Sequence, residues 1–243
     1  MKQLLESWNR FLDEGEEEEK YFGINPEEIP GFKELRNGNQ AEMFSLMQAN
    51  GFKRIGRGGY RLAYAIPGVD DIILKISWSN EGPEQNKKEA NNPIQTEFSD
   101  IVPKIYEAAD DYFWIKQEKV VPMDKSGMEA EEYFQMFFPR IHKVLKRCKA
   151  YDDRWKPFDA LMLGISLAAN RIEPQGDNCG RASGDKIWKC FKQNIETLGQ
   201  DVATRRLAQA HKKYKIEKND IHDGNIGYVV RNGKKQFVIL DFG

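Results

Sequence analysis

The sequence predicts an α+β fold of two lobes, the first an antiparallel β lobe with one helix and the second mainly helical. Residues 51–121 contain short β-branched and aromatic runs separated by turn clusters, which is the pattern of strands. Residues 128–214 contain segments of helical pattern instead. We therefore divide the chain into an N-terminal amphipathic helix with an acidic segment (1–20), the β-rich lobe (21–121) and the helical lobe (122–243).

The composition of the 243 residues is that of an ordinary globular protein, with 40% hydrophobic side chains. The formal net charge of -1, from 37 basic and 38 acidic residues, gives no argument for nucleic acid or for a membrane surface. No apolar run approaches the roughly 20 residues that span a bilayer. The N-terminus is too polar and acidic for a secretory signal, so we expect a cytoplasmic protein.

The three cysteines favour the same location. Cys148, Cys179 and Cys190 form no CxxC pair and are odd in number. This pattern favours reduced thiols in a cytosol over a disulfide framework or a zinc site.

The first predicted element is an amphipathic helix at the N-terminus. Its apolar residues share one helical face: Leu4, Leu5, Trp8, Phe11 and Leu12. An acidic run follows at 13–19. Two interpretations stay open: the helix packs on the body with the acidic run in solvent, or it docks a protein partner.

The β lobe is expected to hold five strands and one helix. One strand precedes the glycines at 56–59, and four more are predicted at 60–66, 71–78, 101–108 and 111–121. A polar helix candidate lies between the two pairs at 83–98, interrupted by Pro93. This order predicts a small antiparallel sheet that carries a single helix.

The second half is expected to be helical up to a final hairpin. Helices are predicted at 128–148, 158–172, 185–199 and 202–214, with a Gly- and Asn-containing loop at 173–185. Near the end, "IGYVV" and "QFVIL" flank the turn "RNGK". Asn-Gly between two β-branched runs is a strong hairpin signal.

Two places in the β lobe point to phosphate chemistry. Gly56, Gly58 and Gly59 lie between two predicted strands, where glycines let backbone N–H groups approach a phosphate chain without interference from Cβ atoms. Lys75 lies in an apolar strand, either turned to solvent or reaching inward to phosphate oxygens. Glu89 on the following helix is either an exposed helix residue or the partner that holds Lys75 in place.

Three oxygen-bearing side chains surround the terminal hairpin. Asp220 and Asn225 are on the loop that leads into it, and Asp241 follows its second strand. A hairpin brings its two ends side by side, so we expect Asp241 to return close to the other two. Phosphoryl transfer needs a carboxylate near the attacking hydroxyl and oxygen ligands for Mg²⁺. The sequence therefore predicts a site for metal and phosphate here.

In this order the motifs resemble the protein-kinase-like superfamily over most of residues 50–243. "GRGGYR" resembles the glycine-rich loop, "ILK" the lysine strand, "NKKEA" the glutamate helix and "IKQEKVV" the hinge. "DIHDGN" resembles the catalytic loop, and "DFG" matches the metal-binding triplet letter for letter. The resemblance implies a two-lobed kinase-like fold, with ATP and Mg²⁺ as donor and cofactor.

The resemblance also implies a role for each candidate residue. Asp220 would be the catalytic base, and Asn225 and Asp241 would be Mg²⁺ ligands. Lys75, oriented by Glu89, would hold the α- and β-phosphates beneath the turn that contains Gly56, Gly58 and Gly59. The backbone of Glu118 and Val120 would meet adenine.

Several residues depart from the protein-kinase pattern. Arg61 replaces the third glycine of the loop, so that phosphate cover is either looser or involves this side chain. Lys218 and Asn219 replace the usual His-Arg, and His222 replaces a lysine. Histidine there, and the long connection from hinge to catalytic loop, are more typical of the aminoglycoside- and choline-kinase-like branch. The sequence given ends at Gly243, so either it is a fragment or the helical stretch 122–210 supplies a rearranged lobe.

Three interpretations follow. The first is an active kinase that transfers the γ-phosphate of ATP to a hydroxyl on a protein (Ser/Thr) or on a small molecule. The second is a pseudokinase or nucleotide-binding interaction module that acts through a protein partner. The third is an unrelated α+β protein, in which Lys75 and Glu89 would not face each other.

Overall fold

A computed structural model describes residues 24–37, 39–152, 156–169, 186–214 and 221–240 of the chain. These residues form two compact units, one made of the chain up to Asn92 together with Lys104–Lys119, the other of Pro93–Pro103 and the chain from Val120 onward. Each unit has its own hydrophobic core. The expected α+β class is confirmed. The helix predicted for 1–20 and the loop predicted for 173–185 lie outside the described residues.

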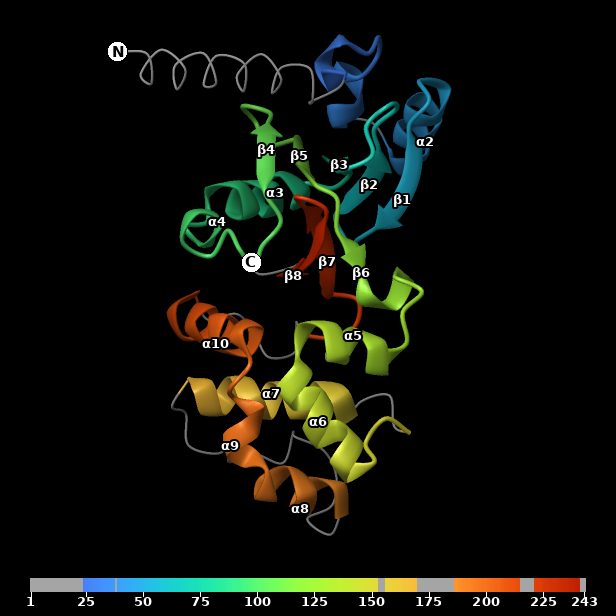
Figure 1. Cartoon of the computed structure of the whole chain (residues 1–243). Helices are drawn as coiled ribbons and strands as arrows, with labels where there is room; N and C mark the ends of the chain where they lie inside the picture. The colour runs from blue at the N-terminus through green and yellow to red at the C-terminus, as the bar shows by residue number, and fades with distance from the viewer. Residues whose placement is uncertain (1–23, 38, 153–155, 170–185, 215–220, 241–243) are drawn as a thin grey trace, which may run out of the picture. The chain divides into compact units, whose positions relative to one another are not determined.

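The first unit is built on a five-stranded antiparallel sheet (Figure 1), as the sequence predicts. Its strands, in spatial order, are β1 (Lys53–Arg57), β2 (Arg61–Ala65), β3 (Ile72–Ser77), β5 (Trp114–Glu118) and β4 (Ile105–Ala108). Because strand side chains alternate between faces, the register sorts them into two sets. Leu62, Leu74 and Ile76 are on one face and are fully buried. The other face carries Arg61, Lys75 and Ser77.

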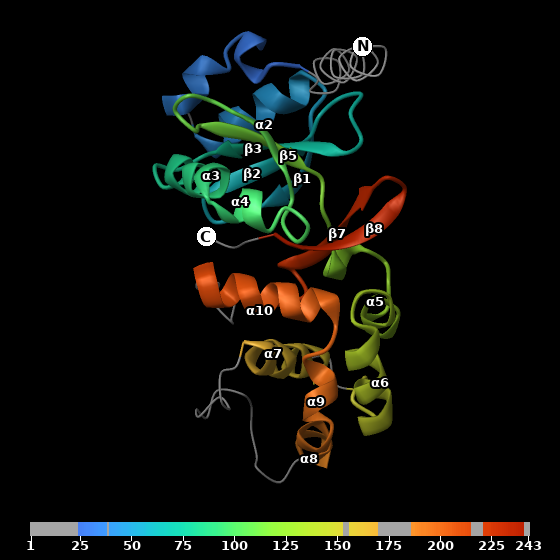
Figure 2. The same ribbon diagram turned by 60° about the vertical axis from the view of Figure 1, so that its left-hand side comes forward.

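Helices cover both faces of this sheet (Figure 2). α2 (Gln40–Ala49) buries Met43 and Met47 in the same cluster as the apolar face, beside the short 3-10 helices η1 (Pro26–Glu28) and η2 (Lys33–Asn37). α3 (Gly82–Asn91) packs on the face that carries Lys75. α2 was not predicted, although its capping box, Asn39 with Glu42, is visible in the sequence as an N-x-x-E helix start.

The candidate helix at 83–98 divides at Pro93. Its second part, α4 (Ile94–Glu97), belongs to the other unit. Three hydrogen bonds tie this crossing segment to the terminal hairpin. Ile239 N donates to Ile101 O at 2.9 Å, and the two Nη atoms of Arg231 donate to Ser99 O at 2.6 Å and to Val102 O at 2.8 Å. These contacts explain why 93–103 belongs to the second unit.

The second unit is mainly helical. It contains η3 (Met123–Lys125), α5 (Ala130–Phe137), α6 (Pro139–Cys148), α7 (Lys156–Ala168), α8 (Lys186–Gln193), α9 (Ile195–Leu198) and α10 (Val202–Tyr214). The single helix predicted for 128–148 is wrong, because Phe138 leaves the helical region (φ -135, ψ 60) before Pro139. The ring of a proline disfavours the α region for the preceding residue. Among the described residues, no helix is both long and apolar enough to cross a membrane.

The terminal hairpin is confirmed. β7 (Ile226–Arg231) and β8 (Lys234–Ile239) pair antiparallel, and β6 (Val121–Pro122) adds a short third strand. Asn232 and Gly233, in the turn, both have positive φ, 52° and 70°. This is the conformation that a two-residue type I′ turn demands, and it explains the Asn-Gly pair.

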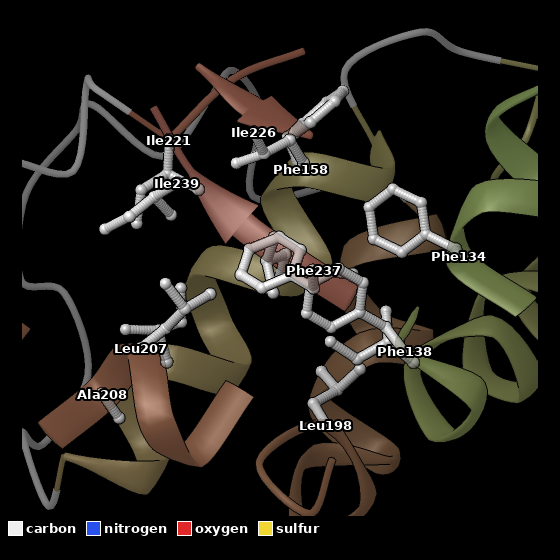
Figure 3. Packing of buried hydrophobic residues seen from close by; sticks show 14 of the residues in the cluster. Phe134, Phe138, Phe158, Leu198, Leu207, Ala208, Ile221, Ile226, Phe237 and Ile239 are labelled. Carbon is white, nitrogen blue, oxygen red and sulfur yellow. The ribbon is translucent and has the colours of Figure 1, made fainter. Parts of the chain in front are cut away.

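The core of this unit joins the helices to the hairpin (Figure 3). The rings of Phe138 and Phe237 meet at 5.0 Å between centroids, and Phe134 packs against Phe138 at 5.4 Å. Ile221, Ile226 and Ile239 are buried in the same cluster. Both ends of the hairpin are therefore anchored by apolar side chains.

One expectation about the cysteines is wrong. Cys148 of α6 and Cys190 of α8 form a disulfide, with 5.7 Å between their Cα atoms, whereas the sequence pattern favoured reduced thiols. The two residues are 42 positions apart, and only the packing of α6 against α8 brings them together. Cys179 lies outside the described residues. The cysteines thus give no support to a cytoplasmic location.

Candidate functional site

In the first unit the structure brings together two of the candidate residues. Lys75 Nζ lies 3.0 Å from Glu89 Oε2, so the lysine of β3 points toward α3. The Glu89 side chain is 1% exposed and that of Lys75 is 15% exposed. This is a nearly buried ion pair between a central strand and the helix that packs on it.

A second cation, which the sequence analysis did not connect with this pair, shares the carboxylate. Arg61 Nη2 donates to Glu89 Oε1 at 2.5 Å, and Arg61 Nη1 donates to Asn86 Oδ1 at 3.1 Å. From the sequence, Arg61 was expected either to loosen the cover over the phosphates or to take part in it. The alternation of β2 and β3 was the available signal, since it places Arg61 on the same face as Lys75.

Asn86 extends this cluster to the last residue of β3 and to the loop before β5. Its side chain is fully buried, and its Nδ2 donates to Ser77 Oγ at 3.1 Å and to Tyr112 O at 2.8 Å. Asn86 and Glu89 are three residues apart, and therefore on one face of α3. That face is polar because it meets polar partners on the sheet.

The electrostatics of Glu89 follow from its two partners. Burial alone would raise the pKa of this carboxyl. The positive charges of Lys75 and Arg61 outweigh burial and hold the pKa of Glu89 below its ordinary value of 4.5. Glu89 is therefore a carboxylate at neutral pH.

The three candidate glycines form the end of β1 and the turn that leads to β2. Gly58 N donates to Arg61 O at 2.8 Å, which closes the turn. Neither Gly58 nor Gly59 has positive φ. A Cβ added at Gly59 would meet nothing within 4 Å, and one at Gly58 would be 3.6 Å from the nearest atom. The fold of this unit therefore does not require glycine at either position.

We predict that Gly59→Ala leaves the free energy of unfolding unchanged or raises it by about 0.4–1 kcal/mol, because alanine restricts the unfolded chain. If the turn binds phosphate, the same change should weaken ATP binding by about tenfold, the equivalent of roughly 1.4 kcal/mol. Thermal unfolding with and without ATP and Mg²⁺ measures both effects.

Gly82→Ala is the contrasting variant. Its Cβ would lie 2.5 Å from Ser77 Cβ and 2.8 Å from Tyr60 O, so we expect a loss of stability there. A Gly59→Ala variant that loses stability but keeps its ATP affinity would contradict the interpretation of the turn.

The candidate hinge residues lie on either side of the unit boundary. Glu118 is the last residue of β5 in the first unit, and Val120 begins the main part of the second. The Glu118 amide donates to Lys104 O at 2.8 Å, and the Lys104 amide donates to Glu118 Oε2 at 3.0 Å. The Glu118 amide is thus already used within the unit.

In the second unit, Asn225 lies where the loop enters β7. Asn225 N donates to His222 O at 2.9 Å, which makes the loop 222–225 a tight turn. Leu240 N donates to Asn225 O at 2.8 Å, so the far end of the hairpin returns to Asn225. Asp220 precedes the buried Ile221, and Asp241 follows Leu240 in the sequence. Both aspartates lie outside the described residues.

One side chain of this loop, that of Asn225, can supply an oxygen ligand to a metal. Asn225 is half-buried, and no hydrogen bond from the described part of the chain reaches its side-chain amide. His222 Nδ1 accepts from Gly224 N at 3.1 Å, which turns this nitrogen toward its own loop. Over the described ranges, no three His, Cys, Asp or Glu residues gather into a metal-binding group. A complete metal site would therefore need the two aspartates.

Comparisons with known proteins add little. No protein-family model and no curated protein matches the chain. A solved structure, the GDP and kanamycin complex of APH(2")-IIia, is similar at 12% identity, over 83% of this chain and 72% of that chain, with a TM-score of 0.29. A similarity at this level carries no argument about the activity of this chain.

Proposed function

We propose that the chain is an ATP- and Mg²⁺-dependent phosphotransferase of the protein-kinase-like type. It transfers the γ-phosphate of ATP to a hydroxyl on a protein (Ser/Thr) or on a small molecule. The observation that carries the proposal is the nearly buried Lys75–Glu89 ion pair. It occurs between the strand and the helix at which the motif order predicts it, whereas an unrelated α+β protein would have no reason to form it.

The residues of the first unit would bind and orient the donor. Lys75, held by Glu89, offers a fixed ammonium group to phosphate oxygens. The turn at Gly58 and Gly59 presents backbone to the phosphates, and the absence of any fold-based need for glycine there supports such a use. The backbone of Glu118, together with that of Val120 from the second unit, would meet adenine.

The residues of the second unit would hold the metal and handle the proton. Asn225 and Asp241 would hold Mg²⁺, which when bound supplies positive charge against the phosphates. Asp220 would orient the acceptor hydroxyl and take its proton. Little covalent work is required, because phosphoryl transfer depends mainly on positioning and charge.

We expect ATP and Mg²⁺ together, but neither alone, to raise the melting temperature of the chain. A ligand at a hundred times its dissociation constant stabilises by about 2.7 kcal/mol, which is a clear shift. The shift should disappear in Asp241→Asn, which weakens the metal-dependent binding itself. Thermal unfolding of both proteins in the four ligand conditions is the measurement.

The other results of the thermal-unfolding experiment decide between the remaining interpretations. Absence of any shift in the unaltered chain would overturn the proposal. A shift that depends on both ligands, without measurable phosphate transfer, would favour a pseudokinase or nucleotide-binding module that acts through a protein partner. The N-terminal helix is the candidate docking element for such a partner, and it stays a prediction.

A further inference from the structure

Polar contacts hold α3 to the rest of the first unit. Those of its buried side chains lie at two successive turns, and at the exposed end of the helix Asn91 Nδ2 donates to Tyr112 Oη at 2.9 Å. At one turn, Glu89 accepts from Lys75 of β3 and from Arg61 of β2. At the other, Asn86 accepts from Arg61 and donates to Ser77 Oγ and Tyr112 O. Arg61 is the one residue of this group that contacts both turns of the helix.

The need for Arg61 follows from the burial of Glu89. A carboxylate that is 1% exposed requires partners for both oxygens, because a buried oxygen without one carries its full desolvation cost. Lys75 engages Oε2, and Arg61 engages Oε1. Without Arg61, the second oxygen of Glu89 would lose its partner, and the carboxylate would be drawn toward solvent and away from Lys75.

The geometry also suits a guanidinium and not an ammonium. The two Nη atoms of Arg61 divide between Glu89 Oε1 at 2.5 Å and Asn86 Oδ1 at 3.1 Å. A planar fork with several donors satisfies both acceptors at once, whereas a lysine is a single point charge. Arg61 also belongs to the glycine turn, since its carbonyl accepts from Gly58 N. It therefore links the turn directly to α3.

We propose that Arg61 is a positioning residue that fastens α3 to the sheet and to the glycine turn, so that Glu89 is held against Lys75 before any nucleotide binds. The importance of that alignment for catalysis rests on the proposed function. The fastening itself does not. Any regulator that displaced this helix would first have to break the contacts of Arg61.

The test is amide hydrogen exchange of the full chain without nucleotide. Arg61→Ala should accelerate exchange of the α3 amides by at least tenfold, and Arg61→Lys should restore protection only in part. Arg57→Ala removes an exposed arginine from the neighbouring strand and is the matched control, with exchange expected to be unchanged. Where Arg61→Ala does not fold, Arg61→Gln, which keeps a donor amide, takes its place under the same criteria.

Equal protection of α3 in the unaltered chain, Arg61→Ala and Arg57→Ala would overturn the inference. This result is separate from the proposed function, because the exchange experiment contains no ATP and the thermal-shift experiment decides nucleotide binding independently. Where both hold, Arg61→Lys should raise KM for ATP and lower kcat by a smaller factor. Lys53→Ala, at an exposed position of β1 outside the glycine turn, should change neither.

Discussion

Asp220→Ala is expected to reduce the rate of γ-phosphate transfer by about 10²–10⁴-fold, the usual contribution of a positioned general base. ATP binding should persist, because Lys75 and the glycine turn belong to the other unit of the molecule. The acceptor class is open, so release of phosphate from ATP and phosphorylation of the chain itself are the two rates to measure. Binding is measured in parallel by the thermal shift with ATP and Mg²⁺.

Asp152→Ala is the control for this variant. Asp152 is an exposed aspartate of the same unit, and its removal should leave rate and binding unchanged. If Asp220→Ala keeps the unaltered rate, Asp220 is not the base. If Asp220→Ala loses both ATP binding and phosphate transfer, Asp220 acts on the nucleotide or its metal instead.

Glu89→Gln is expected to lower the free energy of unfolding by about 3–5 kcal/mol, the usual consequence of removing one partner from a buried ionic group. The change leaves two cations, Arg61 and Lys75, without the carboxylate that they share, and their side chains are only 11% and 15% exposed. Denaturant unfolding at pH 7 measures the difference. Glu84→Gln, at an exposed position of the same helix, should cost at most about 1 kcal/mol.

The pH dependence of this difference identifies its origin. The pKa of folded Glu89 is below 4.5, so the carboxylate contributes its full stabilisation above its unfolded pKa. That contribution is lost as the pH falls through the folded value. The stability gap between the unaltered chain and Glu89→Gln should therefore be constant near neutrality and shrink below about pH 4.5. A gap that stays constant down to pH 3 would assign the effect to packing and not to charge.

Local sequence determined most of the elements and the order of the candidate residues. The Asn-Gly turn specifies the hairpin at Asn232 and Gly233 because both positions need positive φ, and few other residues adopt it readily. Proline ends the helical pattern at Pro93 and Pro139 for an equally local reason. These features depend on backbone sterics within a few residues, which a sequence states directly. The direction of Lys75, toward solvent or inward, stayed open at this level.

Only the tertiary structure decided which distant side chains become partners. The sequence suggested Glu89 for Lys75, but not that Arg61 would occupy the other carboxylate oxygen or that Asn86 would join it. The prediction of reduced thiols was wrong, because the packing of α6 against α8 closes the 42-residue separation between Cys148 and Cys190 and allows their disulfide. Composition and spacing describe what each residue can do. Burial decides which contacts a residue must make, because a charge without water needs a partner from elsewhere in the chain.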